Sequence, residues 1–298
     1  MAKTPTQDFG HQKTPDDIVA ILKAIATSDC IIIGGQAINI WSILLEKKGQ
    51  EPWISNQPYT SIDADGLGDL ASLVKLATAL QEEGYTVDVQ PAEPPDQTKI
   101  NTGLVLATSH RLNIGINIIH QPLGLRSQEI VQTAQPIKFR GTTLKVLHPL
   151  LCVESKAICL IELPQDIPQE PRQDKKHLIL AIANLNVYLT KLGTKDPAGA
   201  AHLADRIRGL AVHHLGIKIL QDHKLDVLDA VPWREWQAAD DAKLKDFGQT
   251  YDVVVQERSS SIAHDKRARE WIENLKNSLG KGTATSPKSK KKRSSKRK

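Results

Sequence analysis

A chain of 298 residues, 40% of them hydrophobic and 24% charged, has the composition of a globular protein with one large domain or two ordinary ones. Its apolar run from Cys30 to Ile33 is far shorter than the roughly 20 residues that span a bilayer, so we expect no membrane helix. The first 28 residues contain three acids and lack the layout of a secretory signal, and the three cysteines form no CxxC pair. These features predict a cytoplasmic protein with reduced thiols.

The net charge of +5 is unevenly distributed along the chain. Residues 281–298 hold nine Lys and Arg and no acid, which leaves 30 basic against 34 acidic residues elsewhere. A segment so rich in Lys and Ser cannot bury enough apolar surface to fold, so we expect a disordered basic tail. Such a tail could neutralise the phosphates of RNA or DNA, contact an acidic surface, or simply keep the protein soluble.

Residues 1–13 are expected to form a disordered lead-in, and Thr14-Pro15 followed by two acids marks the start of a helix. From there to residue 148 the chain alternates between helical and strand patterns. The expected strands cover residues 30–33, 59–65, 85–89, 103–108 and 112–119, with a hairpin over 137–147 around Gly141. The expected helices cover residues 18–25, 36–45 and 69–83.

After His148-Pro149 the strand patterns nearly vanish and helical patterns repeat. The expected helices there cover residues 150–163, 174–192, 198–215, 217–230 and 261–279. The sequence therefore predicts an α+β protein with a mixed-sheet head over residues 14–148, a helical domain over 149–280 and the basic tail over 281–298.

Asp63 and Asp65 lie two residues apart at the end of an expected strand. Alternate side chains of a strand share a face, so the two carboxylates would point the same way from Cα atoms about 7 Å apart. Such a pair can bind magnesium, which prefers oxygen ligands and helps to neutralise phosphate charge. A surface loop explains an isolated Asp-x-Asp about as well.

Gly34 and Gly35 separate the expected strand at 30–33 from the helix that follows. Glycines at such a turn let the backbone approach a ligand closely, and the helix that follows directs its free N–H groups at an anion. A plain tight turn is the alternative.

Taken in order, Ile32-Ile33-Gly34-Gly35-Gln36-Ala37 and Thr60-Ser61-Ile62-Asp63-Ala64-Asp65 resemble the head of the nucleotidyltransferase superfamily. The likeness is to the bacterial group that includes the AbiEii-type toxins and the minimal nucleotidyltransferases, and it covers roughly residues 18–192. A helix with Lys156, followed by a basic segment, agrees with it.

The resemblance implies a magnesium-dependent transferase that moves a nucleotidyl group from an NTP to a hydroxyl of RNA, such as tRNA, or of a protein. It also implies a toxin-like role in a toxin–antitoxin pair or in phage defence. Carried over residue by residue, it assigns nucleotide binding to Gly34 and Gly35, and metal binding to Asp63 and Asp65. Gln36 and Lys156 are further candidates for nucleotide binding, although a lysine on a helix is usually only a solvated charge.

The sequence departs from the family pattern at two positions. Gln36 stands where the family often has a serine, and Asn117 stands where a later strand normally supplies a third acid. Asparagine can coordinate a metal through its carbonyl oxygen, but it carries no charge and cannot act as a general base. Asp88 or His120 could substitute for the acid. Three hypotheses therefore remain open: an active nucleotidyltransferase, an inactive relative that acts as a nucleic-acid or protein-binding module, or an accidental likeness of the motifs.

Overall fold

The computed structural model describes residues 15–45, 64–92, 101–109, 113–139, 141–166 and 172–281. The lead-in over 1–13, the strand residues 59–63 and the basic segment after Lys281 lie outside these ranges, so the expectations for them stay predictions. Within the described ranges, no helix combines the length and the apolar character that a membrane crossing requires.

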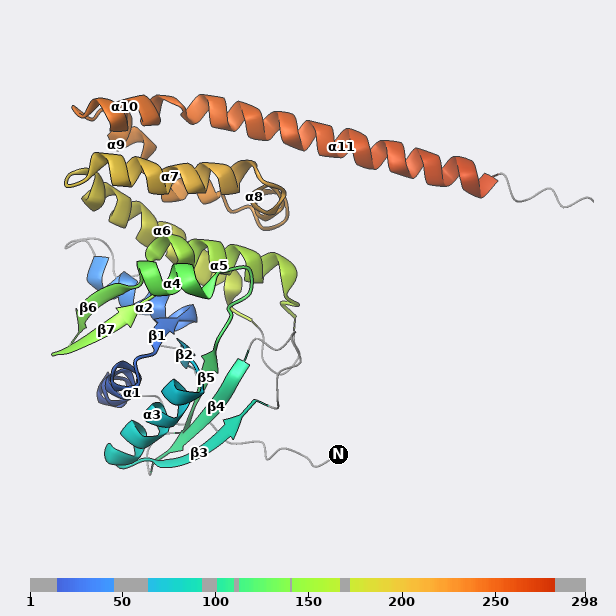
Figure 1. The fold of residues 1–298 in the computed structure, drawn as a ribbon. Coiled ribbons are helices and arrows are strands. Elements are labelled where there is room, and N and C mark those ends of the chain that lie inside the picture. Colours follow the sequence, from blue (N-terminus) through green and yellow to red (C-terminus); the bar gives the residue numbers. More distant parts are fainter. Residues whose placement is uncertain are drawn as a thin grey trace, which may run out of the picture. The chain divides into compact units, whose positions relative to one another are not determined.

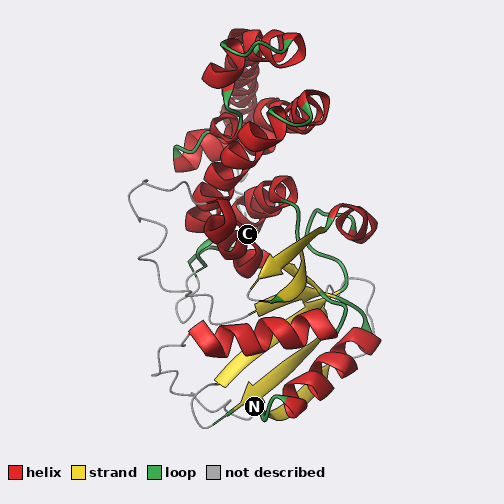
Figure 2. Cartoon of the chain, turned by 90° about the vertical axis from the view of Figure 1, so that its left-hand side faces the viewer, coloured by secondary structure: helices red, strands yellow, loops and turns green. Residues whose placement is uncertain are grey.

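Seven strands form one mixed sheet (Figure 2). They are β1 (Ile31–Ile33), β2 (Ala64–Leu67), β3 (Thr86–Pro91), β4 (Asn101–Thr108), β5 (Asn113–Ile119), β6 (Gln135–Phe139) and β7 (Thr142–Val146). Their order in the sheet is β3-β4-β5-β2-β1-β7-β6, with parallel pairing between β1 and β7 and between β2 and β5. All three isoleucines of β1 are buried, as expected of a short apolar run with a strand on each side.

Four helices accompany the sheet: α1 (Pro15–Thr27), α2 (Gly34–Leu45), α3 (Leu70–Glu82) and α4 (Ser127–Thr133). α1 and α3 lie side by side near the lower strands in Figure 1, and α3 contacts β3 and β4. Asp69 starts α3 by accepting a hydrogen bond from the Ser72 backbone N–H, and Gly84 follows its end with a φ of +87°. The short α4 was not predicted from the sequence.

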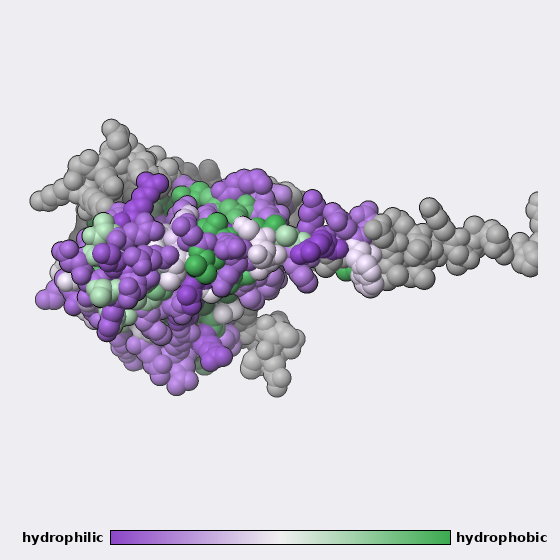
Figure 3. Space-filling view, turned by 90° about the horizontal axis from the view of Figure 1, so that it is seen from above, coloured by the Kyte–Doolittle hydropathy of each residue, from purple (hydrophilic) through white to green (hydrophobic). Residues whose placement is uncertain are grey.

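The remaining helices follow β7 (Figure 1). They are α5 (Pro149–Glu162), α6 (Asp174–Gly193), α7 (Pro197–Val212), α8 (His214–Lys218), α9 (Trp233–Gln237), α10 (Ala242–Gln249) and α11 (Tyr251–Lys281), with a π-helical turn, η1 (Ile219–His223), and a 3₁₀ turn, η2 (Val227–Ala230). The face seen in Figure 3 is mostly hydrophilic, with a few apolar patches. The predicted α+β class, with a mixed sheet followed by a helical half, is confirmed.

Two expected helices of the second half are interrupted. The helix expected over 198–215 breaks at His213, whose backbone is extended and whose ring caps α8 by accepting from the Leu215 N–H at 3.4 Å. The single helix expected over 217–230 is wrong: Lys224 adopts a left-handed conformation with a φ of 57°, and Asp226 caps the separate turn η2. Residues with φ > 0 end an α-helix, and periodicity alone does not reveal them.

Buried hydrogen bonds join α2 to the residue before α5 and to α6. The Trp41 indole on α2 donates to the Leu147 carbonyl at 2.8 Å, and the Asn184 amide on α6 donates to the Ile38 carbonyl at 3.0 Å. By its contacts the chain divides into two compact units, residues 1–251 and 252–298. The domain boundary expected near residue 148 stays a prediction.

Candidate nucleotide and metal site

Two glycines, Gly34 and Gly35, begin α2 directly after β1. Gly34 has a φ of +63°, a left-handed conformation that side chains with a Cβ adopt only at a cost. α2 begins at this residue, so its first backbone N–H groups face the end of β1 and have no partner within the helix. The sequence-based expectation of a strand, two glycines and a helix agrees with this geometry.

Asp65 on β2 lies against this turn. β2 pairs antiparallel with β1, and Asp65 stands directly opposite Ile33, the last residue before Gly34. A Cβ atom on Gly34 would overlap Asp65 Oδ2, so the absence of a side chain at Gly34 makes room for the carboxylate. Asp63, the other half of the Asp-x-Asp motif, lies outside the described residues.

Asn117 on β5 is the cross-strand neighbour of Asp65. The parallel register of β2 and β5 pairs the two residues, and Asn117 Nδ2 lies 3.5 Å from Asp65 Oδ1. Both side chains are partly exposed. An uncharged amide therefore occupies the position beside Asp65 at which the resemblance leads one to expect a third acid.

The two substitutes considered for that acid lie elsewhere. Asp88 is on β3, which β4 separates from β5, and its Oδ2 accepts a hydrogen bond from Gln90 at 2.8 Å. His120 follows the far end of β5, three residues beyond Asn117. Neither residue stands beside Asp65 in the sheet.

Two cationic side chains, Lys156 from α5 and Arg172 from the segment before α6, pair with Asp174. Lys156 Nζ is 2.8 Å from Asp174 Oδ1, and Arg172 Nε is 2.6 Å from Asp174 Oδ2. Asp174 is 2% exposed and Lys156 is 9% exposed, so this ion pair is almost fully buried. Nucleotide binding by Lys156 stays a prediction, and a phosphate would have to share its ammonium with Asp174.

The electrostatics of this cluster connect it to the sheet. Burial would raise the pKa of Asp174, but the charges and hydrogen bonds of Lys156 and Arg172 outweigh burial and hold that pKa below its ordinary value. Burial would likewise lower the pKa of Arg172, but Asp174 and, more weakly, Cys159 and Asp65 raise it. Asp65 is the weakest of these influences on the pKa of Arg172.

His177 on α6 covers the second glycine. A Cβ atom on Gly35 would lie 2.9 Å from His177 Cε1, so the imidazole packs against the start of α2. Burial, reinforced by the charge of Lys156, lowers the pKa of His177 to about 4, which makes the ring neutral near pH 7. Asp174 and His177 were not predicted from the sequence as site residues, although their i, i+3 spacing at a helix start places them on one face.

Gln36 is the third residue of α2 and is 7% exposed. It forms an interaction within the protein, so its side chain is not free. Its predicted role in nucleotide binding stays a prediction.

A magnesium ion at this site would need oxygen ligands from the Asp-x-Asp motif and from Asn117 on β5. Across the described part of the chain, no group of three or more His, Cys, Asp and Glu side chains is placed to hold a metal. Asp65 offers one carboxylate and Asn117 one amide oxygen, which are the oxygen ligands that magnesium prefers. Magnesium binding therefore remains a proposal in which Asp63 supplies the second carboxylate.

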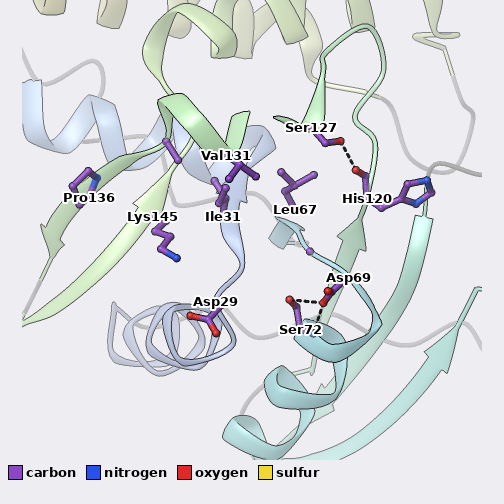
Figure 4. A pocket seen from close by; sticks show the side chains of 12 residues that line it. Asp29, Ile31, Leu67, Asp69, Ser72, His120, Ser127, Val131, Pro136 and Lys145 are labelled. Atoms are coloured by element: carbon purple, nitrogen blue, oxygen red, sulfur yellow. Dashed lines mark hydrogen bonds between the residues drawn. The ribbon is translucent and has the colours of Figure 1, made fainter. Parts of the chain in front are cut away.

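A separate cavity of about 570 Å³ opens at the opposite ends of the same strands (Figure 4). Ile31 and Leu67, from the ends of β1 and β2 that lie away from Gly34, form part of its wall. Asp69 and Lys145 also line it, and the Ser127 hydroxyl donates to the His120 carbonyl at its edge. None of the residues assigned to the candidate site lines this cavity.

Comparisons with known proteins give only distant similarities. No protein-family model matches the sequence, and the search of curated proteins found no match. Among solved structures, JHP933 from Helicobacter pylori is 14% identical, with 86% of this chain and 94% of that chain covered and a TM-score of 0.36. The Megavirus polyadenylate synthase is also 14% identical, with 72% of this chain covered and a TM-score of 0.38, and the match spans only 46% of the viral chain. Because both TM-scores are below 0.5, the function of this chain has to be inferred from its own geometry.

Proposed function

We propose that this protein is a nucleotidyltransferase that moves a nucleotidyl group from an NTP to a hydroxyl of RNA or of a protein, with magnesium. The observation that supports the proposal most strongly is the close approach of Asp65 to the Gly34 turn at the start of α2. A phosphate-binding turn and a metal-binding carboxylate have to be neighbours for this chemistry, and residues 31 positions apart in the sequence are neighbours here.

Each part of the site has a proposed role in this reaction. The Gly34–Gly35 backbone and the first N–H groups of α2 would hold the triphosphate, as helix N-termini commonly do. Asp63 and Asp65 would hold magnesium, which supplies charge neutralisation when bound. Arg172 would add positive charge on the side of the site that faces α6. The acceptor hydroxyl would give its proton to water as its oxygen bonds to the α-phosphorus and the bond to pyrophosphate breaks, and the protein would contribute mainly positioning.

Asn117 favours a second candidate function. An amide beside Asp65 cannot remove a proton from an acceptor hydroxyl and adds no negative charge for a metal. A protein with this substitution could bind nucleotide without turning it over and act as a binding module. The toxin-like role implied by the resemblance belongs to the active alternative alone.

One experiment separates the two functions. The full chain is incubated with each α-labelled NTP, magnesium, total tRNA and a cell lysate, and label transferred to RNA or protein is measured. Asp65→Ala tests the site, and Asp88→Ala is the matched control because Asp88 is an exposed carboxylate on a neighbouring part of the same sheet. Transfer by the wild type and by Asp88→Ala, lost in Asp65→Ala, supports the transferase and identifies its acceptor.

Asn117→Asp extends the same experiment to the inactive alternative. If the wild type transfers no label but binds NTP, and Asn117→Asp gains transfer, then the amide at this position is the cause of inactivity. If neither protein binds any NTP while both remain folded, the proposed site is wrong.

A further inference from the structure

Two neighbouring histidines lie where the helix expected over 198–215 breaks. In an unbroken helix, consecutive residues point about 100° apart, so the imidazoles of His213 and His214 would not meet. The backbone of His213 is extended instead, with a ψ of 153°, and α8 begins at His214. Gly216 permits this sharp change of direction, because a Cβ atom there would overlap the Leu210 carbonyl oxygen. The break brings the two imidazoles together, with ring centroids 4.2 Å apart and planes tilted by 56°.

The two facing nitrogens have the separation of two ligands on one metal ion. His213 Nε2 lies 3.2 Å from His214 Nδ1. With metal–nitrogen bonds of about 2.0–2.1 Å, two ligands of a tetrahedral ion lie about 3.3 Å apart, and two adjacent ligands of a square-planar ion about 2.9 Å apart. The observed separation falls between these values. Each ring has to rotate only slightly to direct its nitrogen at a shared ion, and the χ2 angle of histidine is soft enough to allow this.

We propose that His213 and His214 bind a divalent transition metal, Cu²⁺, Ni²⁺ or Zn²⁺, through these two nitrogens. Imidazole is a preferred ligand of these three ions, whereas magnesium prefers oxygen. Both histidine side chains are exposed, so an ion reaches them directly from solvent. The proposal does not rest on nucleotidyl transfer, and the ion it concerns is separate from the magnesium proposed at Asp65.

A proton leaves His213 Nε2 when the metal binds. The Leu215 N–H donates to His213 Nδ1 at 3.4 Å, so in the neutral ring this nitrogen carries no proton. The single ring proton is then on Nε2, from which it can be donated to His214 Nδ1. The metal replaces this proton, which moves through water to His213 Nδ1. The Leu215 N–H loses its acceptor, at little cost because a hydrogen bond of 3.4 Å is already long.

Water supplies the remaining ligands. The His213 ring lines a cavity of about 350 Å³ together with Gly209 and Leu210, which leaves room beside the ion. Glu154 lines the same cavity, but its carboxylate accepts hydrogen bonds from Arg206 Nε and Nη2 at 3.0 and 2.6 Å. In the described part of the chain, no third His, Cys, Asp or Glu side chain joins the pair. With two imidazole ligands, affinity should follow the general order of divalent ions, in which Cu²⁺ binds most tightly.

The proposal is tested by calorimetric titration of the full chain with Cu²⁺, Ni²⁺ and Zn²⁺ in turn. His214→Gln removes one ligand, and His213→Asn removes the other while it keeps a residue type that caps α8. Each variant should weaken binding at this site by at least about 10- to 100-fold, the effect of removing even an indirect partner of a metal. His202→Gln is the matched control, because His202 is an exposed histidine on α7. Its affinity should equal that of the wild type.

A spectrum of the bound ion tests the ligands directly. The electron paramagnetic resonance spectrum of Cu²⁺ on the wild type should show coupling to two imidazole nitrogens, and this pattern should disappear in His213→Asn and in His214→Gln. Far-UV circular dichroism shows that each variant is folded.

Four outcomes would overturn the proposal. Failure of all three ions to bind the wild type would exclude the site. Equal affinities of the wild type, His213→Asn and His214→Gln would place the metal elsewhere in the chain. A loss in His202→Gln as large as that in His214→Gln would show binding to scattered surface histidines. A loss confined to one of the two site variants would show a single imidazole ligand instead of a pair.

Discussion

Replacing Gly34 by Ala is the sharpest test of the geometry at the start of α2. Any side chain at this left-handed position costs about 1–2 kcal/mol. At Gly34 a second cost follows, because the new Cβ would overlap Asp65 Oδ2 and force the carboxylate to turn away. Gly84 is the matched control: it has a similar φ of +87°, and a Cβ there would meet nothing within 4 Å.

Thermal unfolding of the full chain separates the two costs. A change of 1 kcal/mol shifts the Tm by about 2–4 °C in a unit of this size, so Gly84→Ala should lower it by roughly 2–8 °C. Gly34→Ala should lower the Tm further. If the wild type gains stability from an NTP with magnesium, the gain at a hundred-fold excess over Kd is about 2.7 kcal/mol, and it should persist in Gly84→Ala and vanish in Gly34→Ala. Equal Tm values for the two variants would refute the contact between Gly34 and Asp65.

Two further predictions concern buried ionisable groups. Asp174→Asn leaves the buried ammonium of Lys156 without its carboxylate and should reduce the free energy of unfolding by about 3–5 kcal/mol in urea denaturation. The control Asp205→Asn removes one partner of an exposed ion pair and should cost less than about 1 kcal/mol. Similar losses in the two variants would contradict the burial of the Lys156–Asp174 pair. Burial, and then the charge of Arg206, lowers the pKa of His148 to about 4. Between pH 6.5 and 4 the unfolded chain therefore binds a proton that the folded chain excludes. The free energy of unfolding falls as the pH drops through that range. An asparagine at this position can still cap α5, and His148→Asn should weaken this loss of stability by up to about 3 kcal/mol. An unchanged pH profile of the unfolding free energy would refute the role of His148.

Much of the head could be predicted from local patterns. The isoleucine run of β1, the glycines after it and the amphipathic α3 each have a strong signal within a short window, and the structure has all three. The helix α4 gave no such signal, since only Ile130 among its seven residues is buried. Breaks in the second half depend on single residues with unusual backbone angles, such as Lys224, which a periodic pattern does not reveal.

The candidate site was only partly predictable for a different reason. Asp65 and Asn117 were singled out because short motifs contain them, and the structure shows that they are neighbours in the sheet. His177 comes from a helix more than a hundred residues after Gly35, and nothing in its own segment shows that it reaches this glycine. Contacts of this kind follow from the packing of α2 against α5 and α6, which is a property of the whole unit.

The position of β1 inside the sheet, between β2 and β7, has a consequence for protein synthesis. Its neighbour β7 lies far along the chain, and so does the Leu147 carbonyl, which accepts a hydrogen bond from the Trp41 indole 106 positions earlier. At ribosomal rates of about 5–20 residues per second, the nascent chain waits roughly 5–20 s for them. During that interval β1 has an open strand edge, and α2, which contacts β1, is not yet covered by α5 and α6. The growing polypeptide is therefore most prone to aggregate, and most in need of a chaperone, before α6 leaves the ribosome.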